Sequence, residues 1–249
     1  MKIGLIGAGN MASALARGWG EPVLVYDAYR PRADALVAEL GGEVAESNAE
    51  LAQRCDAVLL AHKPAGLERV ARELGGEAKG IISILGGVSL AALRAAYGAT
   101  PVVRMIPSVP VEVRQGVTCH ARDGDADAAL ETPAIELFKR VGLVISLDES
   151  QMEVATGLMS CAPAYVALVA EAQVDAGVRA GLPADVAGDL VAANIGGTAA
   201  LLQARGMDTL AVRRMVTSPG GITARGLAAL EHAGLRAAFD DAMQAVVAG

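Results

Sequence analysis

The sequence predicts an α/β fold for the first part of the chain, a Rossmann-like dinucleotide-binding domain over residues 1–148, and an all-α domain over residues 149–249. Three observations support this division. A glycine-rich turn directly follows the first apolar strand, short apolar strands then alternate with helical segments, and no convincing strand occurs after residue 148. We therefore expect a dinucleotide site in the first domain and a separate role for the helices of the second.

The composition limits the class of protein. Of the 249 residues 53% are hydrophobic, and a formal net charge of −7 argues against a nucleic-acid or anionic membrane surface. The three cysteines lack metal-site spacing and suggest a reducing compartment, and the three histidines do not cluster, so no metal site is predicted. With neither a leader segment nor an uninterrupted run of about 18 apolar residues, we expect a cytoplasmic protein without a membrane span.

The first element is an apolar strand over residues 2–6, followed by the sequence Gly-Ala-Gly-Asn-Met-Ala over residues 7–12 and then a helix. This order of strand, tight turn and helix is the context that the G-x-G-x-x-G/A motif requires. Gly7 permits the turn, Gly9 lets a pyrophosphate approach the backbone, and Ala12 keeps the helix close to the sheet. The predicted cofactor-binding residues of this turn are Gly7, Ala8, Gly9, Asn10 and Met11.

The second strand, residues 23–27, ends in an acidic residue. Asp27 falls 20 residues after Gly7, where a carboxylate can accept hydrogen bonds from an adenosine ribose, which favours NAD. Arg30 and Arg32 follow at once and suit a 2′-phosphate, which favours NADP. These residues alone leave the choice between the two cofactors open.

Further strands are expected over residues 57–61, 81–85, 101–107, 116–120 and 143–146, with a helix near 126–140. The strand 57–61 leads into His62, Lys63 and Pro64 at the carboxyl edge of the sheet, where open α/β sheets bind ligands. Lys63 suits contact with the nicotinamide ribose or transfer of a proton. The alternative is an ordinary surface lysine at the end of a strand.

The helical domain is interrupted by the turn at residues 216–223, Val-Thr-Ser-Pro-Gly-Gly-Ile-Thr. A helix that begins at this turn presents unpaired N–H groups, with the hydroxyls of Thr217, Ser218 and Thr223 beside them, and so suits a small anion such as a carboxylate. The alternative is a plain capped turn between helices. Residues 164–180 are apolar over much of the helix circumference, which suits a helix buried in an intertwined dimer.

Taken together, these motifs resemble the pyrroline-5-carboxylate reductases over nearly the whole chain. The most specific match is the 216–223 turn, and shorter matches occur at residues 7–11, 61–64, 163–165, 175–177 and 181–183. The resemblance implies NADPH- or NADH-dependent reduction of the cyclic imine 1-pyrroline-5-carboxylate to L-proline, the last step of proline biosynthesis. It also implies homodimers joined through the helical domain, and decamers of five dimers.

The resemblance also implies roles for individual residues. Ser218, Gly220, Gly221 and Thr223 would hold the substrate carboxylate, with Thr223 also near the ring nitrogen. Lys63 and Pro64 would lie at the nicotinamide end of the cofactor, and Asn48 at its adenosine end. Thr223, Lys63 or water would supply any proton, and NADPH is favoured as the cofactor by the family and the arginines, NADH by Asp27.

Three segments depart from the family pattern, at Ser108-Val109, at Ser160-Cys161-Ala162 and at Arg214. They leave two alternatives open, a reductase of a different cyclic imine and a non-catalytic NAD(P)H-binding or sensing protein. A β-hydroxyacid dehydrogenase would need a lysine on a helix of the second domain, and no lysine follows Lys139.

Overall fold

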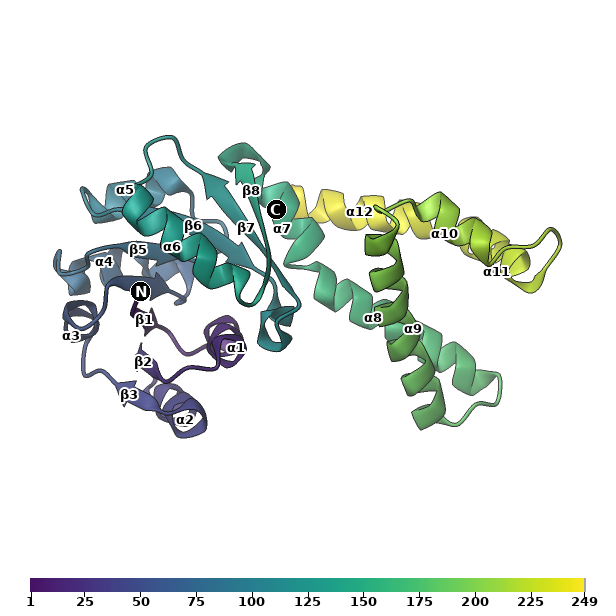
Figure 1. Cartoon of the computed structure of the whole chain (residues 1–249), viewed down its shortest axis with the longest axis horizontal. Helices are drawn as coiled ribbons and strands as arrows, with labels where there is room; N and C mark the ends of the chain where they lie inside the picture. Colours follow the sequence, from purple (N-terminus) through teal and green to yellow (C-terminus); the bar gives the residue numbers. More distant parts are fainter. Residues whose placement is uncertain (249) are drawn as a thin grey trace. The chain divides into compact units, whose positions relative to one another are not determined.

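The structure, a computed structural model, describes residues 1–248 and contains two compact units (Figure 1). The first unit runs from Met1 to Pro163 and the second begins at Ala164. The predicted boundary at residue 148 coincides with the end of the last strand. The helix that follows, α7 (Met152–Met159), buries Met152 in the core of the first unit, which therefore continues to Pro163.

The first unit is built on one eight-stranded sheet with the order β3-β2-β1-β4-β5-β6-β7-β8. All neighbouring strands are parallel except β6 and β7, which are antiparallel. The strands are β1 (Ile3–Ile6), β2 (Val23–Tyr26), β3 (Gly42–Val44), β4 (Ala57–Leu60), β5 (Ile81–Ser83), β6 (Val102–Pro107), β7 (Gly116–Arg122) and β8 (Gly142–Asp148). This arrangement confirms the predicted Rossmann-like α/β class.

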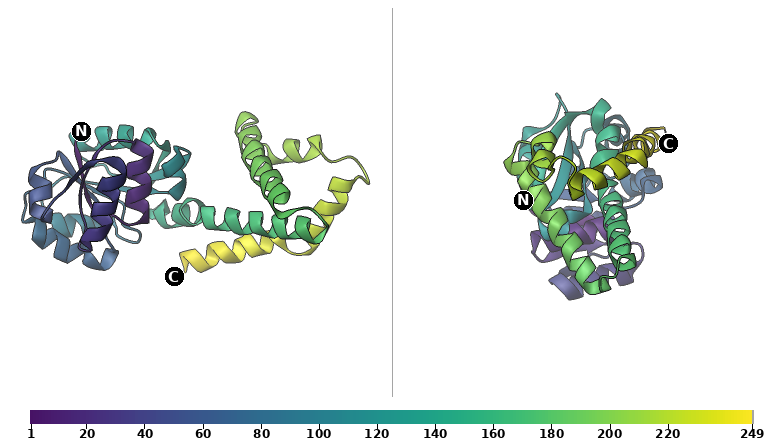
Figure 2. Two further views of the ribbon diagram at one scale, coloured as in Figure 1. Left: turned by 90° about the horizontal axis from the view of Figure 1, so that it is seen from below. Right: turned by 90° about the vertical axis from the view of Figure 1, so that its right-hand side faces the viewer.

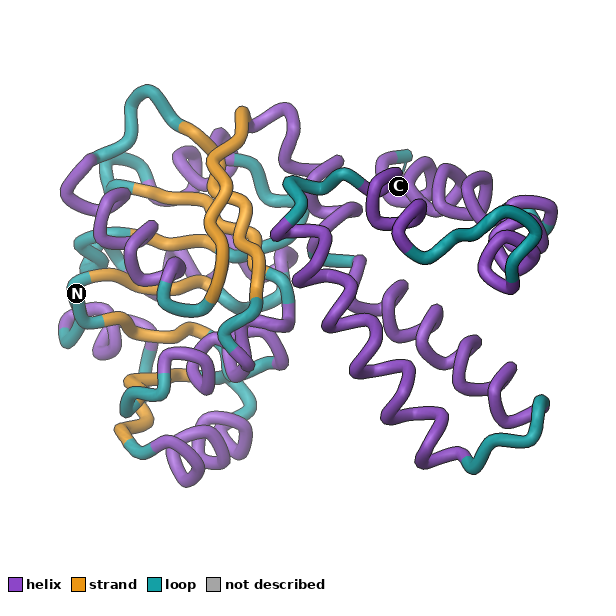
Figure 3. Tube along the Cα trace, turned by 45° about the vertical axis from the view of Figure 1, so that its right-hand side comes forward, coloured by secondary structure: helices purple, strands orange, loops and turns teal. Residues whose placement is uncertain are grey.

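Helices cover both faces of the sheet (Figure 3). Alternate residues of each strand point to opposite faces, so Leu59 packs in one core and Leu60 in the other. The first core joins the sheet to α3, α4, α5 and α7, and the second joins it to α1, α2 and α6. The additional helices are α1 (Asn10–Trp19), α2 (Arg30–Leu40), α3 (Asn48–Gln53), α4 (Leu67–Leu74), α5 (Leu90–Tyr97) and α6 (Ala128–Lys139), with 3₁₀ turns η1 (Pro64–Gly66), η2 (Val109–Val113) and η3 (Glu149–Gln151).

The second unit is entirely helical within the described residues (Figure 2). Its helices are α8 (Ala162–Arg179), which starts at the end of the first unit, α9 (Ala184–Ala204), α10 (Thr209–Met215), α11 (Ile222–His232) and α12 (Leu235–Val247). Of their described residues only Ala187 is buried, whereas large apolar side chains such as Leu168, Ile222 and Phe239 are exposed. A single chain leaves these apolar faces uncovered, as expected for helices that pack against another subunit.

One helical stretch, Glu149–Arg179, is long and apolar enough to cross a membrane by length and composition alone. Helices in the cores of water-soluble proteins meet the same criterion. Only 11% of its most apolar 18-residue segment is buried within the chain, so most of its apolar surface is exposed and can pack against a partner. Charged residues interrupt this stretch, so it contains no continuous apolar run of about 18 residues, but its mean hydropathy is high.

Candidate functional site

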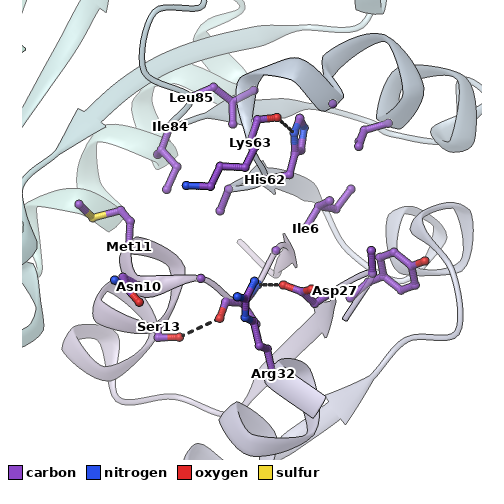
Figure 4. Close-up of a pocket in the computed structure, with 18 of the residues that line it drawn as sticks. Ile6, Asn10, Met11, Ser13, Asp27, Arg32, His62, Lys63, Ile84 and Leu85 are labelled. Carbon is purple, nitrogen blue, oxygen red and sulfur yellow. Dashed lines mark hydrogen bonds between the residues drawn. The ribbon is translucent and has the colours of Figure 1, made fainter. Parts of the chain in front are cut away.

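A cavity of about 1030 Å³ opens in the first unit, beside the carboxyl ends of β1, β2, β4 and β5 (Figure 4). These strands flank the point at which the strand order reverses, where open α/β sheets bind ligands. The predicted cofactor residues that line it are Gly7, Ala8, Gly9, Asn10, Met11, Asp27, Arg32, Asn48, Lys63 and Pro64. The fold thus brings together every residue predicted to bind the cofactor except Arg30.

The glycine-rich turn forms one wall of the cavity. Gly7 has a φ of +107°, and a Cβ at this position would lie 2.8 Å from the carbonyl oxygen of Ala61, so glycine is required by the fold. A Cβ on Gly9, by contrast, would meet no atom within 4 Å. Gly9 precedes α1 without a side-chain cap, so the first N–H groups of that helix are available to an anion such as a pyrophosphate.

Asp27 stabilises this turn through hydrogen bonds to the backbone. One carboxylate oxygen accepts a hydrogen bond from the backbone N–H of Ala8 at 2.7 Å, and the other accepts from the N–H of Tyr29 at 2.8 Å. The motif predicted only ribose binding for Asp27, and these backbone contacts give it a structural use as well. The bonds to Ala8 and Tyr29 occupy both oxygens, although each oxygen keeps a second lone pair.

The two arginines after β2 lie in different environments. Arg32 lines the cavity, lies over the ring of Tyr29 with its guanidinium carbon 5.7 Å from the ring centroid, and forms no ion pair within residues 1–248. Arg30 is not part of the cavity wall. It forms an ion pair with Glu46 at 2.8 Å and approaches Asp34 at 3.6 Å.

The wall opposite the glycine-rich turn is formed by residues that follow β4. The exposed Lys63 side chain extends toward the side of the cavity where Asn10 and Met11 lie (Figure 4) and makes no ion pair with any described residue. Its carbonyl oxygen accepts hydrogen bonds from the N–H of Gly66 at 2.9 Å and from His62 Nδ1 at 2.8 Å. His62, which was not among the predicted site residues, also lines the cavity, and the bond to Lys63 orients its ring.

The 216–223 turn lies in the second unit, between α10 and α11. Gly220 has a φ of +67°, and the carbonyl oxygen of Ser218 accepts the N–H of Gly221 at 3.0 Å. A Cβ on Gly221 would press on Ser218 Oγ and force that hydroxyl to rotate, whereas the left-handed φ of Gly220 favours glycine directly. Gly221 precedes α11 without a side-chain cap, which leaves the first N–H groups of this helix open to an anion.

The hydroxyls of this turn differ in their bonding. Thr217 Oγ1 donates to the carbonyl oxygen of Arg213 at 2.6 Å and so completes the end of α10. The Ser218 and Thr223 hydroxyls have no hydrogen-bond partner among the described residues. Of the three predicted hydroxyls, only these two remain available beside the helix N-terminus.

Two of the unusual segments take part in the fold itself. Ser108 is buried, and its Oγ accepts the N–H of Val117 at 2.9 Å while its own N–H donates to the Val117 carbonyl, also at 2.9 Å. The serine thus joins η2 to β7. The N–H groups of Ser160 and Cys161 both donate to the Thr156 carbonyl and end α7.

Two protein-family models match different parts of the chain. Residues 2–87 match the model described as NADP oxidoreductase, coenzyme F420-dependent. Residues 149–249 match the model described as pyrroline-5-carboxylate reductase dimerisation.

Individual relatives cover nearly the entire chain. A pyrroline-5-carboxylate reductase of Synechocystis sp. is 36% identical over 98% of this chain and 95% of its own length. One of Methanosarcina acetivorans is 36% identical over 97% of this chain and 94% of its own length. Among solved structures, Plasmodium falciparum pyrroline carboxylate reductase with NADP bound has a TM-score of 0.89 and 28% identity over 99% of this chain and 95% of that chain.

Proposed function

The chain belongs to the pyrroline-5-carboxylate reductase family, and from that membership we propose which of its residues bind the cofactor, the substrate and a second subunit. The family reaction is the reduction of the C=N bond of 1-pyrroline-5-carboxylate to L-proline by NADPH or NADH. The observation that supports it best is a cavity lined by the Gly7–Met11 turn and by Lys63 and Pro64.

The cavity suits a nicotinamide dinucleotide. The open space beside Gly9 and the uncapped start of α1 would receive the pyrophosphate, and Asn48 would lie at the adenosine end. Lys63 and Pro64 would lie at the nicotinamide end. When bound, the cofactor supplies the hydride, and the residues of the chain orient it and exclude water from the reacting atoms.

For the cofactor preference we propose NADPH. Arg32 supports this choice because it is a cation in the cavity wall without an ion-pair partner among the described residues. Asp27 opposes it less than the sequence suggests, because both carboxylate oxygens already accept backbone N–H groups. A guanidinium binds a 2′-phosphate through charge-assisted hydrogen bonds, whereas the 2′-hydroxyl of NADH offers it a weaker acceptor.

The carboxylate of the imine would bind at the 218–223 turn. The open N–H groups of α11, the backbone at Gly220 and Gly221, and the free hydroxyls of Ser218 and Thr223 form a cradle for one small anion. A protonated imine is already electrophilic, so the protein mainly has to place it. Thr223 and Lys63 are the candidates for supplying a proton when the imine is neutral.

The second unit supports a dimer, in line with the dimerisation model that it matches. The uncovered apolar side chains of α8 to α12 would become buried between two chains, and five such dimers would form the proposed decamer. A cytoplasmic location agrees with the three free thiols of Cys55, Cys119 and Cys161. Sedimentation velocity measures the assembly directly.

A spectrophotometric assay tests the proposed activity. Loss of reduced-nicotinamide absorbance is followed with the five-membered imine 1-pyrroline-5-carboxylate and with a six-membered cyclic imino acid, each with NADPH and with NADH. We expect rapid turnover of the five-membered substrate with formation of proline. Faster turnover of the six-membered ring, or tight cofactor binding without turnover of either imine, would contradict the proposal.

A further inference from the structure

His62 Nε2 is a buried acceptor without a partner in the cavity wall. The Lys63 carbonyl can only accept, so the 2.8 Å contact with His62 Nδ1 requires a proton on Nδ1. In the neutral ring Nε2 then carries the lone pair. This atom is shielded from solvent and has no hydrogen-bond partner among the described residues. A buried acceptor left unpaired costs free energy, so such an atom indicates a donor supplied by a ligand.

The surroundings of His62 keep its ring neutral. Burial lowers the pKa of His62 below its usual value, and the nearby guanidinium of Arg69 lowers it further, while the Lys63 carbonyl and Glu73 raise it. Arg69 and Glu73 form an ion pair at 2.6 Å, so the charges facing the ring from α4 largely offset each other. Lys63, the other charged neighbour, extends its side chain toward the far side of the cavity (Figure 4).

Asn48 supplies a second unpaired acceptor to the same cavity. Its side chain is only 3% exposed, and its Nδ2 donates to Glu73 Oε2 at 2.6 Å. A carboxylate can only accept, so this bond fixes the orientation of the amide and leaves Oδ1 as the free acceptor. Oδ1 is buried and has no partner within residues 1–248. His62 and Asn48 therefore each present a buried acceptor without a partner to the same cavity.

We propose that His62 is a further cofactor-binding residue of this enzyme, and that its Nε2, together with Asn48 Oδ1, accepts hydrogen bonds from donor groups of the adenosine half of the dinucleotide. Phosphate oxygens carry no proton to donate, so this part of the wall selects against them. Adenosine offers two kinds of donor, the amino group of its base and the hydroxyls of its ribose. The inference rests on the proposed dinucleotide site and specifies what one wall of that site recognises.

Binding constants for three cofactors distinguish the two donors. NADH carries both the amino group and a 2′-hydroxyl, its hypoxanthine analogue replaces the amino group by a carbonyl, and NADPH replaces the 2′-hydroxyl by a phosphate. Each is titrated by nicotinamide fluorescence against the wild-type protein, His62→Phe, which keeps a ring without an acceptor, and His62→Gln, which keeps an acceptor. Thermal melts establish that each variant is folded.

If the amino group is the donor, the preference for NADH over its hypoxanthine analogue should fall about three- to tenfold in His62→Phe and return in His62→Gln. If the ribose hydroxyl is the donor, the NADH-to-NADPH affinity ratio should fall by that factor and the base preference should stay constant. Unchanged affinities for all three cofactors in a folded His62→Phe variant would overturn the inference, while such normal cofactor binding would leave the proposed function intact. Failure of the wild-type protein to bind any of the three would instead contradict the dinucleotide site.

Discussion

The backbone N–H of Ala8 donates a hydrogen bond to Asp27 Oδ2 at 2.7 Å, and this contact ties the end of β2 to the glycine-rich turn. Gly7 reinforces the link, since its own N–H donates to the Tyr26 carbonyl at 2.8 Å. The shape of the cofactor-binding turn therefore depends on an acidic residue 19 positions later in the sequence. A residue in this position has a structural role before any ribose is bound.

Replacement of Asp27 by Ala should separate the structural role from ribose binding. The variant leaves the N–H groups of Ala8 and Tyr29 without acceptors, so we expect a loss of about 1–3 kcal/mol of stability without cofactor. Affinity for NADH and NADPH should fall by similar factors. Denaturant unfolding and cofactor titration measure the two effects. If NADH binding alone weakened and stability stayed constant, Asp27 would serve only as a ribose acceptor.

The proposed preference for NADPH is tested by a matched pair of arginine variants. Arg32→Ala should weaken NADPH binding about tenfold and NADH binding little, because it removes a cation that lines the cavity. Arg30→Ala is the control, since Arg30 pairs with Glu46 and is not part of the cavity wall. A reversed result, with the larger loss of NADPH affinity in Arg30→Ala, would place the 2′-phosphate on the other arginine.

Most of the sheet was predictable because buried strands have continuous apolar sequences. Seven of the eight strands fall on segments expected to be strands, most of them short apolar runs such as residues 57–61 for β4. The missed strand, β3, is three residues long, and its Gly42 and Glu43 are exposed, so it has neither an apolar run nor alternation. β3 is a strand because it pairs with β2, and the residues of β3 themselves carry no sequence pattern that predicts this pairing.

The site was predictable only as far as local sequence determines it. The residues of the motif, Gly7 to Met11, all line the cavity. The two arginines lie two residues apart on α2 and do not share a face, and nothing in the local sequence distinguishes Arg32 from Arg30. The Thr217 hydroxyl is unavailable to a ligand because it donates to the Arg213 carbonyl, and the His62 ring is oriented by its bond to the Lys63 carbonyl. Neither bond is visible in the sequence. A single histidine without a motif carries no signal of such a role.

Substitutions of the two glycines of the cofactor turn should have different effects, one on dinucleotide binding and the other on stability. Gly9→Val should abolish dinucleotide binding yet leave the fold intact, because a Cβ there meets no atom of the chain and instead occupies the space proposed for the pyrophosphate. Gly7→Ala should reduce stability by about 1–3 kcal/mol, because its φ of +107° is unfavourable for alanine and the new methyl group presses on the Ala61 carbonyl. Thermal melts and cofactor titration separate the two outcomes. Normal dinucleotide binding by Gly9→Val would refute the assignment of this turn.

The hydroxyls of the 216–223 turn provide the corresponding test for the substrate. Thr223→Ala removes a hydroxyl that has no partner among the described residues, so stability should change by no more than about 0.5 kcal/mol. We expect KM for 1-pyrroline-5-carboxylate to rise about tenfold, since a hydrogen bond to a charged group is worth about 1.5–3 kcal/mol, while the affinity for NADPH stays constant.

Thr217→Val is the matched control, because its hydroxyl donates to the Arg213 carbonyl and its loss should lower stability by about 1 kcal/mol with little change in KM. Steady-state kinetics at saturating NADPH gives both constants. A larger rise in KM for Thr217→Val than for Thr223→Ala would show that the free hydroxyl is not the one that holds the carboxylate.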